Sequence, residues 1–519
     1  MIMADAVDEK RQSLEKRRST DDPEVTTVSV NDEYGDEALQ LVGKERQIEF
    51  SEEYYAKLRR KLDWWIPPLC ASVYFTQFLD KTSLNYASIM GLPITGQKYN
   101  LVALAFYLGF LVWEFPTVYL SQKTGRVAKY LGANIILWGI ILMLHAVTAS
   151  FGAFFALRFL LGMCESCVAP TLILIISMFY RKDEQARRIS WFYVMNGLTQ
   201  VFGGFVAYGV SFYSGKALAP YKIIYFLLGG MAIVVGLLVT FFMPDSPIHA
   251  PLLTKEERVA ALERVREDQV GVENKVLKRE QVIEALSDPR TWLIVLTTML
   301  TSIPNGGLSN FSNIIIKNFG YTSKQVLILS TPGGVIGSLT VLACGWYSDK
   351  RKERMLPIVF CLVPTIVGFA ILIGLAHSGQ KGVLLFGSYL TGTFGSALSS
   401  VYAYNASNTA GHTKKSTINA LTLATFALGN IIGTEIFLPK DAPDYLPGKI
   451  AVMVLLTVQI AVSYLLRWIN IRMNRQKRAA LEAEIARQGW TEQDVQKQRE
   501  RHAFADLTDK QNIFFEYTI

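Results

Sequence analysis

Six charged side chains stand inside long apolar stretches of this sequence, and they are the residues best placed to do chemistry: Asp80, Lys81, Glu114, Arg158, Glu165 and Glu435. A charged side chain at the centre of a bilayer costs at least about 2.5–3.5 kcal/mol, so it is a candidate for binding a solute or carrying a proton. A guanidinium offers a carboxylate two parallel donors and keeps its own proton, whereas a carboxylate can gain and lose one. Arg158 would therefore suit a substrate carboxylate.

The spacing of these residues predicts which of them can act together. Arg158, Gly162 and Glu165 are four and three residues apart, which places them on one face of a helix, with room beside the glycine for another group. Asp80 and its neighbour Lys81 point about 100° apart on a helix, so they cannot serve one partner equally well. Alternatively, Arg158 and Glu165 form a structural ion pair that only holds helices together.

Uncharged polar residues in other apolar stretches add further candidates. The segment 302–307 contains Pro304 and two glycines, which predicts a broken helix in which Asn305 contacts a solute; the alternative is a hinge without a ligand. Tyr404 and Asn405 would give a polar and aromatic lining, or an interfacial anchor. Glu114, beside Pro116, favours a structural or interfacial role.

The elements that must position these residues are apolar helices. Of the 519 residues 50% are apolar and 18% charged, and the mean hydropathy is +0.25, which excludes a disordered chain and disfavours a soluble enzyme. Because a span needs about 20 apolar residues, we expect twelve membrane helices. The apolar blocks lie near 65–90, 101–120, 131–149, 152–179, 191–213, 222–243, 291–316, 325–346, 356–376, 383–404, 417–438 and 450–470.

The positive charges predict the orientation of these blocks. The net charge is +8, and Lys and Arg gather in the loops 120–130, 180–190, 347–355 and 411–416, which the positive-inside rule places in the cytoplasm. Both ends of the chain are then cytoplasmic. We expect a tail with an amphipathic helix at 1–63, a six-helix bundle at 64–243, a linker at 244–290, a second six-helix bundle at 291–470 and a tail at 471–519. All five cysteines lie in or beside apolar blocks and are expected to be packing residues.

Six spans, a linker and six spans resemble the major facilitator transporters. The loop after the eighth block is similar to that superfamily's G-x-x-x-D-[RK] signature at Gly345, Asp349 and Lys350. The loop after the second block keeps only Gly125 and Arg126 of the pattern, because Val118 and Gln122 replace its first glycine and its aspartate. The gating or structural candidates are Glu114, Gly125, Arg126, Gly345, Asp349 and Lys350.

An ordered series of shorter stretches resembles one fungal branch of this superfamily, the allantoate permease branch of the anion:cation symporters. The series includes 77–87, 158–165, 243–247, 253–258, 410–415 and 506–512. The resemblance implies proton-coupled uptake of a small organic anion across a fungal plasma membrane, and a central cavity lined by spans one, four, seven and ten. Asp80 would then pair with Arg158 in the empty cavity, and protonation of Asp80 or Glu165 would free Arg158 for the substrate. The substrate-binding or proton-coupling candidates are Asp80, Lys81, Arg158, Glu165, Asn305, Tyr404 and Asn405.

The expected partners are a small organic anion, protons and the lipid bilayer. The anion would be a carboxylate, vitamin, ureide, amino acid or peptide. We expect a monomer that binds no cofactor, metal or nucleic acid and is not an enzyme, since the sequence has no phosphate-binding loop and no histidine cluster. Two alternatives stay open: an efflux carrier for an endogenous metabolite, and a nutrient sensor with little transport.

Overall fold

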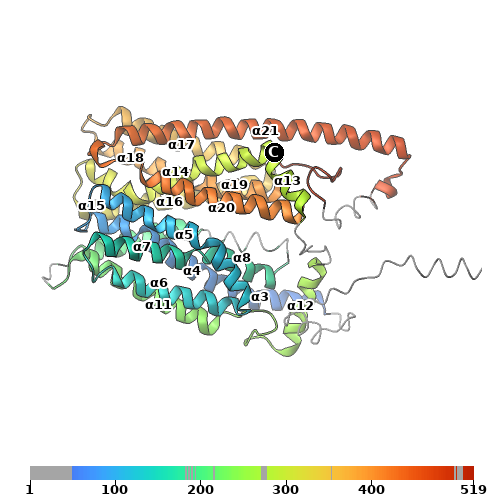
Figure 1. Cartoon of the computed structure of the whole chain (residues 1–519), viewed down its shortest axis with the longest axis horizontal. Coiled ribbons are helices and arrows are strands. Elements are labelled where there is room, and N and C mark those ends of the chain that lie inside the picture. Colours follow the sequence, from blue (N-terminus) through green and yellow to red (C-terminus); the bar gives the residue numbers. More distant parts are fainter. Residues whose placement is uncertain are drawn as a thin grey trace, which may run out of the picture. The chain divides into compact units, whose positions relative to one another are not determined.

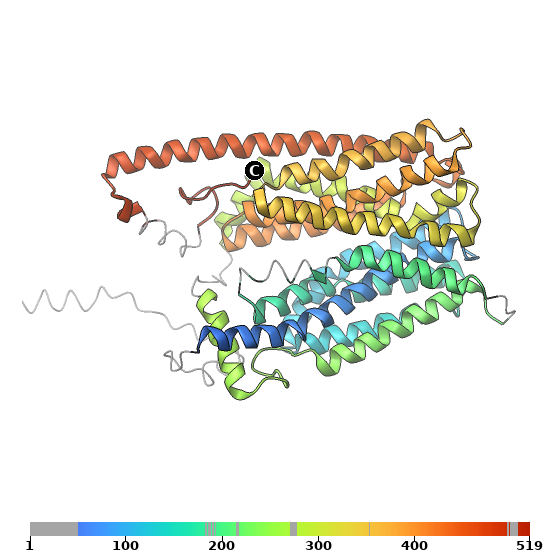
Figure 2. The same cartoon turned by 180° about the vertical axis from the view of Figure 1, so that it is seen from behind.

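The computed structural model describes residues 50–519, apart from 182–183, 185–187, 189–190, 193, 214–216, 270–277, 352, 496–497 and 499–506. Residues 50–519 form one compact unit, and its described part contains helices and no strand (Figures 1 and 2). Most of the expected tail at 1–63 lies outside the described residues. The five cysteines are buried and free, as expected of packing residues.

The first half of this unit is built from eight helices in its described part. Ser51 caps α3 and Ser150 caps α7 through their hydroxyls, and prolines stand in the first turns of α4 and α11. The helices are α3 (Glu52–Asp63), α4 (Ile66–Ser88), α5 (Gln97–Lys123), α6 (Val127–Leu144), α7 (Phe151–Glu165), α8 (Val168–Phe179), α10 (Met195–Val210) and α11 (Pro220–Phe242).

The second half follows two linker helices, α12 (Lys255–Gln269) and α13 (Arg279–Ser287). Helix α12 contacts α3 and α8, whereas α13 contacts α14 and α20, so the described parts of the linker belong to different halves. The further elements are α14 (Pro289–Asn318), α15 (Ser323–Leu329), α16 (Thr331–Arg351), α17 (Met355–Gly374), α18 (Lys381–Thr391), η1 (Gly392–Phe394), α19 (Gly395–Asn408), α20 (His412–Thr434), η2 (Pro439–Asp441) and α21 (Leu446–Gln488).

Eight stretches of the described chain are long and apolar enough to cross a membrane. Four predicted blocks are not among them: α4 and α14 carry polar residues, α10 is described over 16 residues, and α18 and α19 are separated by η1. The eight stretches are Gln97–Ser121, Val127–Leu144, Phe151–Phe179, Pro220–Phe242, Ser323–Ser348, Met355–Gly374, Thr413–Thr434 and Leu446–Gln488.

Glycines allow the close helix pairs of both halves. A Cβ atom added to Gly162 on α7 would lie 1.9 Å from the backbone oxygen of Phe106 on α5, and one added to Gly306 on α14 would lie 2.3 Å from that of Asn430 on α20. The space expected beside Gly162 for another group is therefore filled by the α5 backbone.

The predicted break at 302–307 is wrong, because α14 runs as one helix of 30 residues through Pro304. The hydroxyls of Thr301 and Ser302 donate to backbone oxygens one turn earlier, at 2.9 and 2.6 Å. The two glycines that suggested a break instead allow contact with α20 and Phe437. Local sequence could not distinguish these two uses of glycine, because the packing partner lies more than 120 residues away.

Candidate functional site

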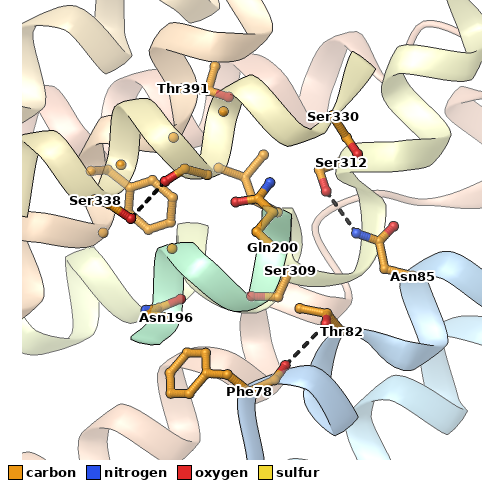
Figure 3. Close-up of a pocket in the computed structure, with 18 of the residues that line it drawn as sticks. Phe78, Thr82, Asn85, Asn196, Gln200, Ser309, Ser312, Ser330, Ser338 and Thr391 are labelled. Carbon is orange, nitrogen blue, oxygen red and sulfur yellow. Dashed lines mark hydrogen bonds between the residues drawn. The ribbon is translucent and has the colours of Figure 1, made fainter. Parts of the chain in front are cut away.

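Two adjoining cavities, each of about 180 Å³, lie between the helices of the two halves. They share Lys81, Asn196 and Asn305, among other residues. One is rich in hydroxyl and amide side chains, of which Figure 3 labels Thr82, Asn85, Asn196, Gln200, Ser309, Ser312, Ser330, Ser338 and Thr391. The other is rich in aromatic rings, namely those of Tyr74, Phe78, Phe106, Tyr107, Phe110, Phe394, Tyr402 and Phe426.

Lys81 supplies the positive charge in the wall of both cavities. Its Nζ atom lies 5.5 Å from the ring centre of Phe78, 5.4 Å from that of Tyr107 and 5.7 Å from that of Phe426. Within the described residues no carboxylate oxygen comes within 4.0 Å of this ammonium, and Lys81 is the one Lys or Arg side chain that lines either cavity. The rings stabilise the cation weakly, which leaves it able to bind an anion.

Asp80 lies on the same helix but does not line either cavity. It is 1% exposed, and neither of its carboxylate oxygens has a hydrogen-bond donor in the described structure. Arg158, 2% exposed, also stays outside the cavities. It donates through Nη2 to the hydroxyls of Ser83, at 3.1 Å, and Tyr225, at 3.4 Å.

The expected ion pair between Asp80 and Arg158 is not formed in this arrangement, although Arg158 is close enough to act on Asp80 electrostatically. Ser83 connects them instead, because its hydroxyl accepts from Arg158 and donates to the backbone oxygen of Asp80 at 2.6 Å. The three residues form a polar cluster behind the cavity wall.

Glu165 is the one acidic side chain among the residues that line the two cavities. It is 1% exposed, and both of its carboxylate oxygens are without a hydrogen-bond donor in the described structure. Arg158 and Lys81 both interact with it electrostatically. Glu165 is thus influenced both by the cation in the cavity and by the cation behind its wall.

The other solute-binding candidates divide between the cavity and its surroundings. Asn305 lines both cavities and donates to the side-chain oxygen of Asn430 at 2.7 Å. Tyr404 and Asn405 line neither cavity. The hydroxyl of Tyr404 accepts from Asn470 at 2.7 Å, and Asn405 donates to the side-chain oxygen of Asn419 at 2.9 Å.

Contacts between the two halves close one end of this space. The hydroxyl of Tyr99 donates to the backbone oxygen of Asn310 at 2.7 Å, and the amide of Asn100 donates to that of Phe437 at 3.0 Å. Asn85 donates to Ser312 at 2.8 Å and accepts from the backbone N–H of Asn313. We call this the sealed end, and the opposite end, where α13 and the start of α14 lie, the linker end.

Residues 70–434 match the family model described as the Major Facilitator Superfamily. The chain belongs to this superfamily. It is 33% identical to the allantoate permease of Saccharomyces cerevisiae, covering 93% of this chain and 90% of that one, and 30% identical to the thiamine pathway transporter of the same yeast, covering 97% of each. The xylose transporter XylE from E. coli superposes with a TM-score of 0.60 at 12% identity, covering 77% of this chain and 98% of that one.

This major facilitator chain is therefore a multi-pass membrane transporter and not an enzyme, which confirms the predicted superfamily and its fungal relatives. The all-helical fold of the superfamily is confirmed as well.

The gating candidates of this major facilitator chain lie away from its cavity. Gly125 has a φ of 62°, which suits glycine, and Arg126 is exposed. Lys350 lies 4.8 Å from the ring centre of Trp346. Gly345 is exposed, whereas the side chain of Asp349 lies outside the described residues. Glu114 is buried outside both cavities, and its Oε2 atom has no hydrogen-bond partner in the described structure.

Sequence reasoning missed the polar residues that α10 contributes to the cavity of this transporter. Asn196 and Gln200 both line it, and they are four residues apart, so they share a helix face. Two amides at this spacing in an apolar block could have predicted that this face of the helix lines a polar cavity. Small hydroxyl residues such as Ser338 gave none, because they are common in all membrane helices.

Proposed function

We propose that this chain is a secondary transporter that takes up a small organic anion together with protons by alternating access. The observation that carries the proposal is Lys81, a cation on the cavity wall with aromatic rings around it and no carboxylate of the described chain within 4.0 Å. An anion entering the cavity would supply the missing charge. Lys81 thus replaces Arg158 as the first partner of the substrate carboxylate.

The proton sites in this proposal are Asp80 and Glu165. A carboxylate buried without a hydrogen-bond donor is costly when ionised, and a bound proton removes that cost. Glu165 lies on the cavity wall beside Lys81, so a proton on Glu165 would also leave Lys81 free to attract the substrate. Arg158 would then stabilise whichever carboxylate is ionised. Its hydroxyl partners support a fixed position during the cycle.

The cavity lining supports a substrate class. Asn196, Gln200 and Asn305 present amide groups that can pair with amides or ureido groups of a solute. Allantoate is a carboxylate with two ureido groups, and a relative 33% identical to this chain is named for it. We infer a ureide or a similar amide-bearing carboxylate, with the aromatic cavity available to apolar parts. Vitamins, amino acids and short peptides are the wider class.

The same proposal includes twelve spans and their orientation. The eight apolar stretches of the described chain, together with α4, α10, α14 and α18–α19, would make two bundles of six, at 64–243 and 291–470. The linker 244–290 and the tails 1–63 and 471–519 would be cytoplasmic, which makes the sealed end extracellular. We place a monomer in a fungal plasma membrane, with Gly125, Arg126, Gly345, Asp349 and Lys350 in loops that act during the conformational change and Glu114 in a structural role.

Uptake of radiolabelled allantoate and related carboxylates into a transport-deficient yeast tests this function. Accumulation that a protonophore abolishes supports symport. Outward movement from preloaded vesicles, without uptake, would instead indicate the efflux carrier. Signalling on exposure to the solute, without flux in either direction, would indicate the nutrient sensor.

Glu165→Gln tests the proton site, because glutamine keeps the size of the side chain but cannot take part in proton transfer. We expect solute exchange across the membrane to continue and proton-driven accumulation to fall at least tenfold. Asn134→Ala is a matched control, since the Asn134 amide bonds only within α6. Unchanged accumulation in Glu165→Gln would remove this residue from the coupling scheme.

A further inference from the structure

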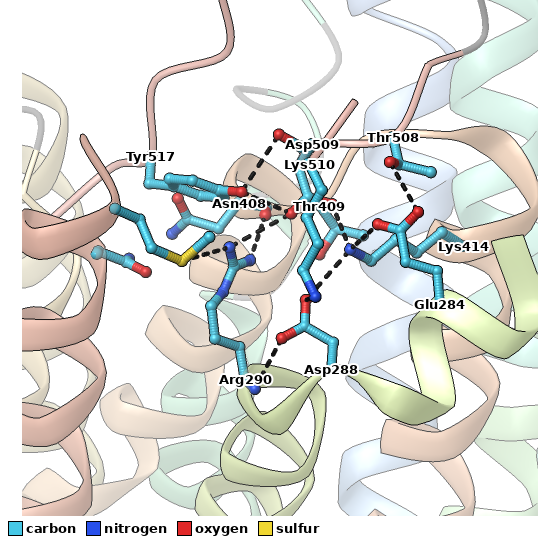
Figure 4. Close-up of polar contacts among 12 residues, drawn as sticks. Glu284, Asp288, Arg290, Asn408, Thr409, Lys414, Thr508, Asp509, Lys510 and Tyr517 are labelled. Carbon is cyan, nitrogen blue, oxygen red and sulfur yellow. Dashed lines mark hydrogen bonds and ion pairs between the residues drawn. The ribbon is translucent and has the colours of Figure 1, made fainter. Parts of the chain in front are cut away.

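Residues 507–519, which we call the strap, lie against the linker end of the second half. Thr508 and Asp509 are both fully buried (0% exposed). Thr508 donates its hydroxyl to Glu284 of α13 at 2.9 Å, and it closes a turn by exchanging hydrogen bonds with Gln511. Figure 4 shows the strap residues meeting side chains of α13, α14, α19 and α20.

Asp509 completes a buried charge cluster. Its carboxylate lies 2.8 Å from Lys414 of α20 and 3.3 Å from Arg290 of α14, which are 1% and 4% exposed. Lys414 also pairs with Glu284 at 2.9 Å and with Asp288 at 3.3 Å. Loss of the Asp509 carboxylate would leave the buried Arg290 guanidinium without this ion pair, and removing one partner from a buried ion pair is strongly destabilising.

The final strap residues are recognised through both side chain and backbone. The ring of Tyr517 lies 4.1 Å from the Arg290 guanidinium, and its hydroxyl donates to Asp509 at 2.9 Å. Asn474 of α21 donates to the backbone oxygen of Tyr517 and accepts from its N–H, both at 2.8 Å. Asn408 of α19 makes the same two bonds with Thr518, at 3.1 and 2.7 Å.

Helix α14 connects this cluster to the cavity and to the sealed end. Arg290 stands in its first turn, Asn305 and Ser309 line the cavity, and Asn310 and Ser312 contact the other half at the sealed end. Because α14 is unbroken over 30 residues, or about 45 Å, a tilt at one end is transmitted to the other. Arg290 also donates to the backbone oxygen of Asn408 at 2.9 Å, which ties α14 to α19 at the strap.

We propose that the linker ends of α13, α14, α19, α20 and α21 form a peptide-binding site whose ligand is this chain's own strap. Docking of the strap holds α14 against α19 and thereby keeps the sealed end closed. Release of the strap frees the first turn of α14, lets the helix tilt and opens the sealed end more often. The effect of the strap on the sealed end does not depend on which solute is transported, so it can be tested in the absence of solute.

The first test is whether the strap docks in the full-length protein. Hydrogen exchange of the Tyr517 and Thr518 amides, followed by mass spectrometry, should be slow because both are bonded to buried asparagines. Asp509→Ala combined with Tyr517→Ala should speed this exchange by on the order of 100-fold, since it removes the buried carboxylate and the ring on Arg290. Glu516→Gln is the matched control: it removes only an exposed ion pair with Arg478 and should leave exchange unchanged.

The second test is whether docking controls the sealed end. Gln200→Cys places a reporter thiol in the cavity, and a membrane-impermeant maleimide applied to intact cells labels it only when the sealed end opens. We expect at least fivefold faster labelling in the double variant. A synthetic peptide with the sequence of residues 507–519, supplied to the outer face of everted vesicles that enclose the maleimide in their lumen, should restore the slow rate. The same peptide with both substitutions should not.

Three results would overturn the proposal. Fast exchange of the strap amides in the unaltered protein would exclude docking. If the strap is released and the labelling rate is unchanged, docking of the strap does not control the sealed end. If the peptide does not restore the slow labelling rate, the strap does not bind as a separate peptide. If the double variant fails to fold, Tyr517→Phe serves instead, because it removes only the bonds of the hydroxyl to the carboxylate and backbone oxygens of Asp509 and should speed both exchange and labelling about fivefold.

Discussion

At the scale of single residues, neighbouring charges on α4 have different surroundings. Lys81 is on the cavity wall, whereas Asp80 is in the polar cluster behind it with Arg158. The sequence predicted that Asp80 and Lys81 point in different directions, because adjacent residues on a helix point about 100° apart. It did not predict which of the cations faces the cavity, because that depends on how α4 and α7 are rotated against α5, α6 and α11.

Replacement of Lys81 tests which cation meets the substrate. We expect Lys81→Ala to reduce the apparent affinity for the anion by roughly 10- to 100-fold, because one charge-assisted hydrogen bond is worth about 1.5–3 kcal/mol. Lys81→Arg should keep a large part of the affinity, because it keeps the positive charge. The measurement is a thermal-shift titration of the purified protein with allantoate and related carboxylates. If both variants fold and Arg158→Ala loses more affinity for the anion than Lys81→Ala does, Arg158 and not Lys81 is the main partner of the substrate.

Asp288, at the start of α14, predicts a pH dependence of stability. Burial alone would raise the pKa of this carboxyl, but Arg290 and Lys414 hold it below its usual value. The stabilisation from Asp288 is therefore fully present above the pKa of the unfolded chain, near 4, and is lost as the pH falls through the lower folded pKa. Asp288→Asn keeps the cap on the Arg290 N–H and should cost roughly 1–3 kcal/mol at pH 7.

Thermal unfolding in detergent between pH 7 and pH 3 measures this effect. The melting temperatures of the unaltered protein and Asp288→Asn should converge toward the acid end of the series, because protonation removes the same charge as the substitution. A constant difference between them at every pH would show that Asp288 contributes through something other than its charge.

At the scale of helices, the sequence predicts the elements better than their contacts. Hydropathy placed apolar blocks close to the helices that are present, because burial in lipid requires long apolar runs. The continuity of α14 could not be predicted from Pro304 and its glycines, since their packing partners lie on α20 and at Phe437. The buried contact between Asp509 and Arg290 could not be predicted from the sequence either, because the two residues are 219 positions apart.

The contact of α5 with α7 gives a test at this scale. A methyl group at Gly162 meets the Phe106 backbone, which cannot move without shifting α5, so Gly162→Ala should destabilise the protein by about 1–3 kcal/mol. Gly230→Ala, in α11, meets no atom within 4 Å and should be neutral or stabilising. Melting temperature in detergent compares the two. Equal melting temperatures would show that α5 and α7 are farther apart than described.

At the scale of the whole molecule, transport by alternating access requires that the contacts of the sealed end break while others form at the linker end. Asn85 and Asn100 make side-chain hydrogen bonds across the halves, to Ser312, to the Asn313 N–H and to the Phe437 backbone. Each such bond contributes about 0.5–1.5 kcal/mol net. Asn85→Ala with Asn100→Ala removes three such bonds and should therefore shift the equilibrium toward opening by roughly 10- to 2,000-fold, because opening of the sealed end must break them.

The rate at which a Gln200→Cys thiol is labelled by an external, membrane-impermeant maleimide measures that shift. It should rise in the double alanine variant and stay unchanged in Asn134→Ala, whose lost bond lies inside α6. Because the two arrangements share one equilibrium, a solute that binds the cavity more tightly in the opened form should increase labelling further and should itself bind the double variant more tightly. Faster labelling without tighter binding would mean that the opened form seen by the thiol is not the one that receives the solute.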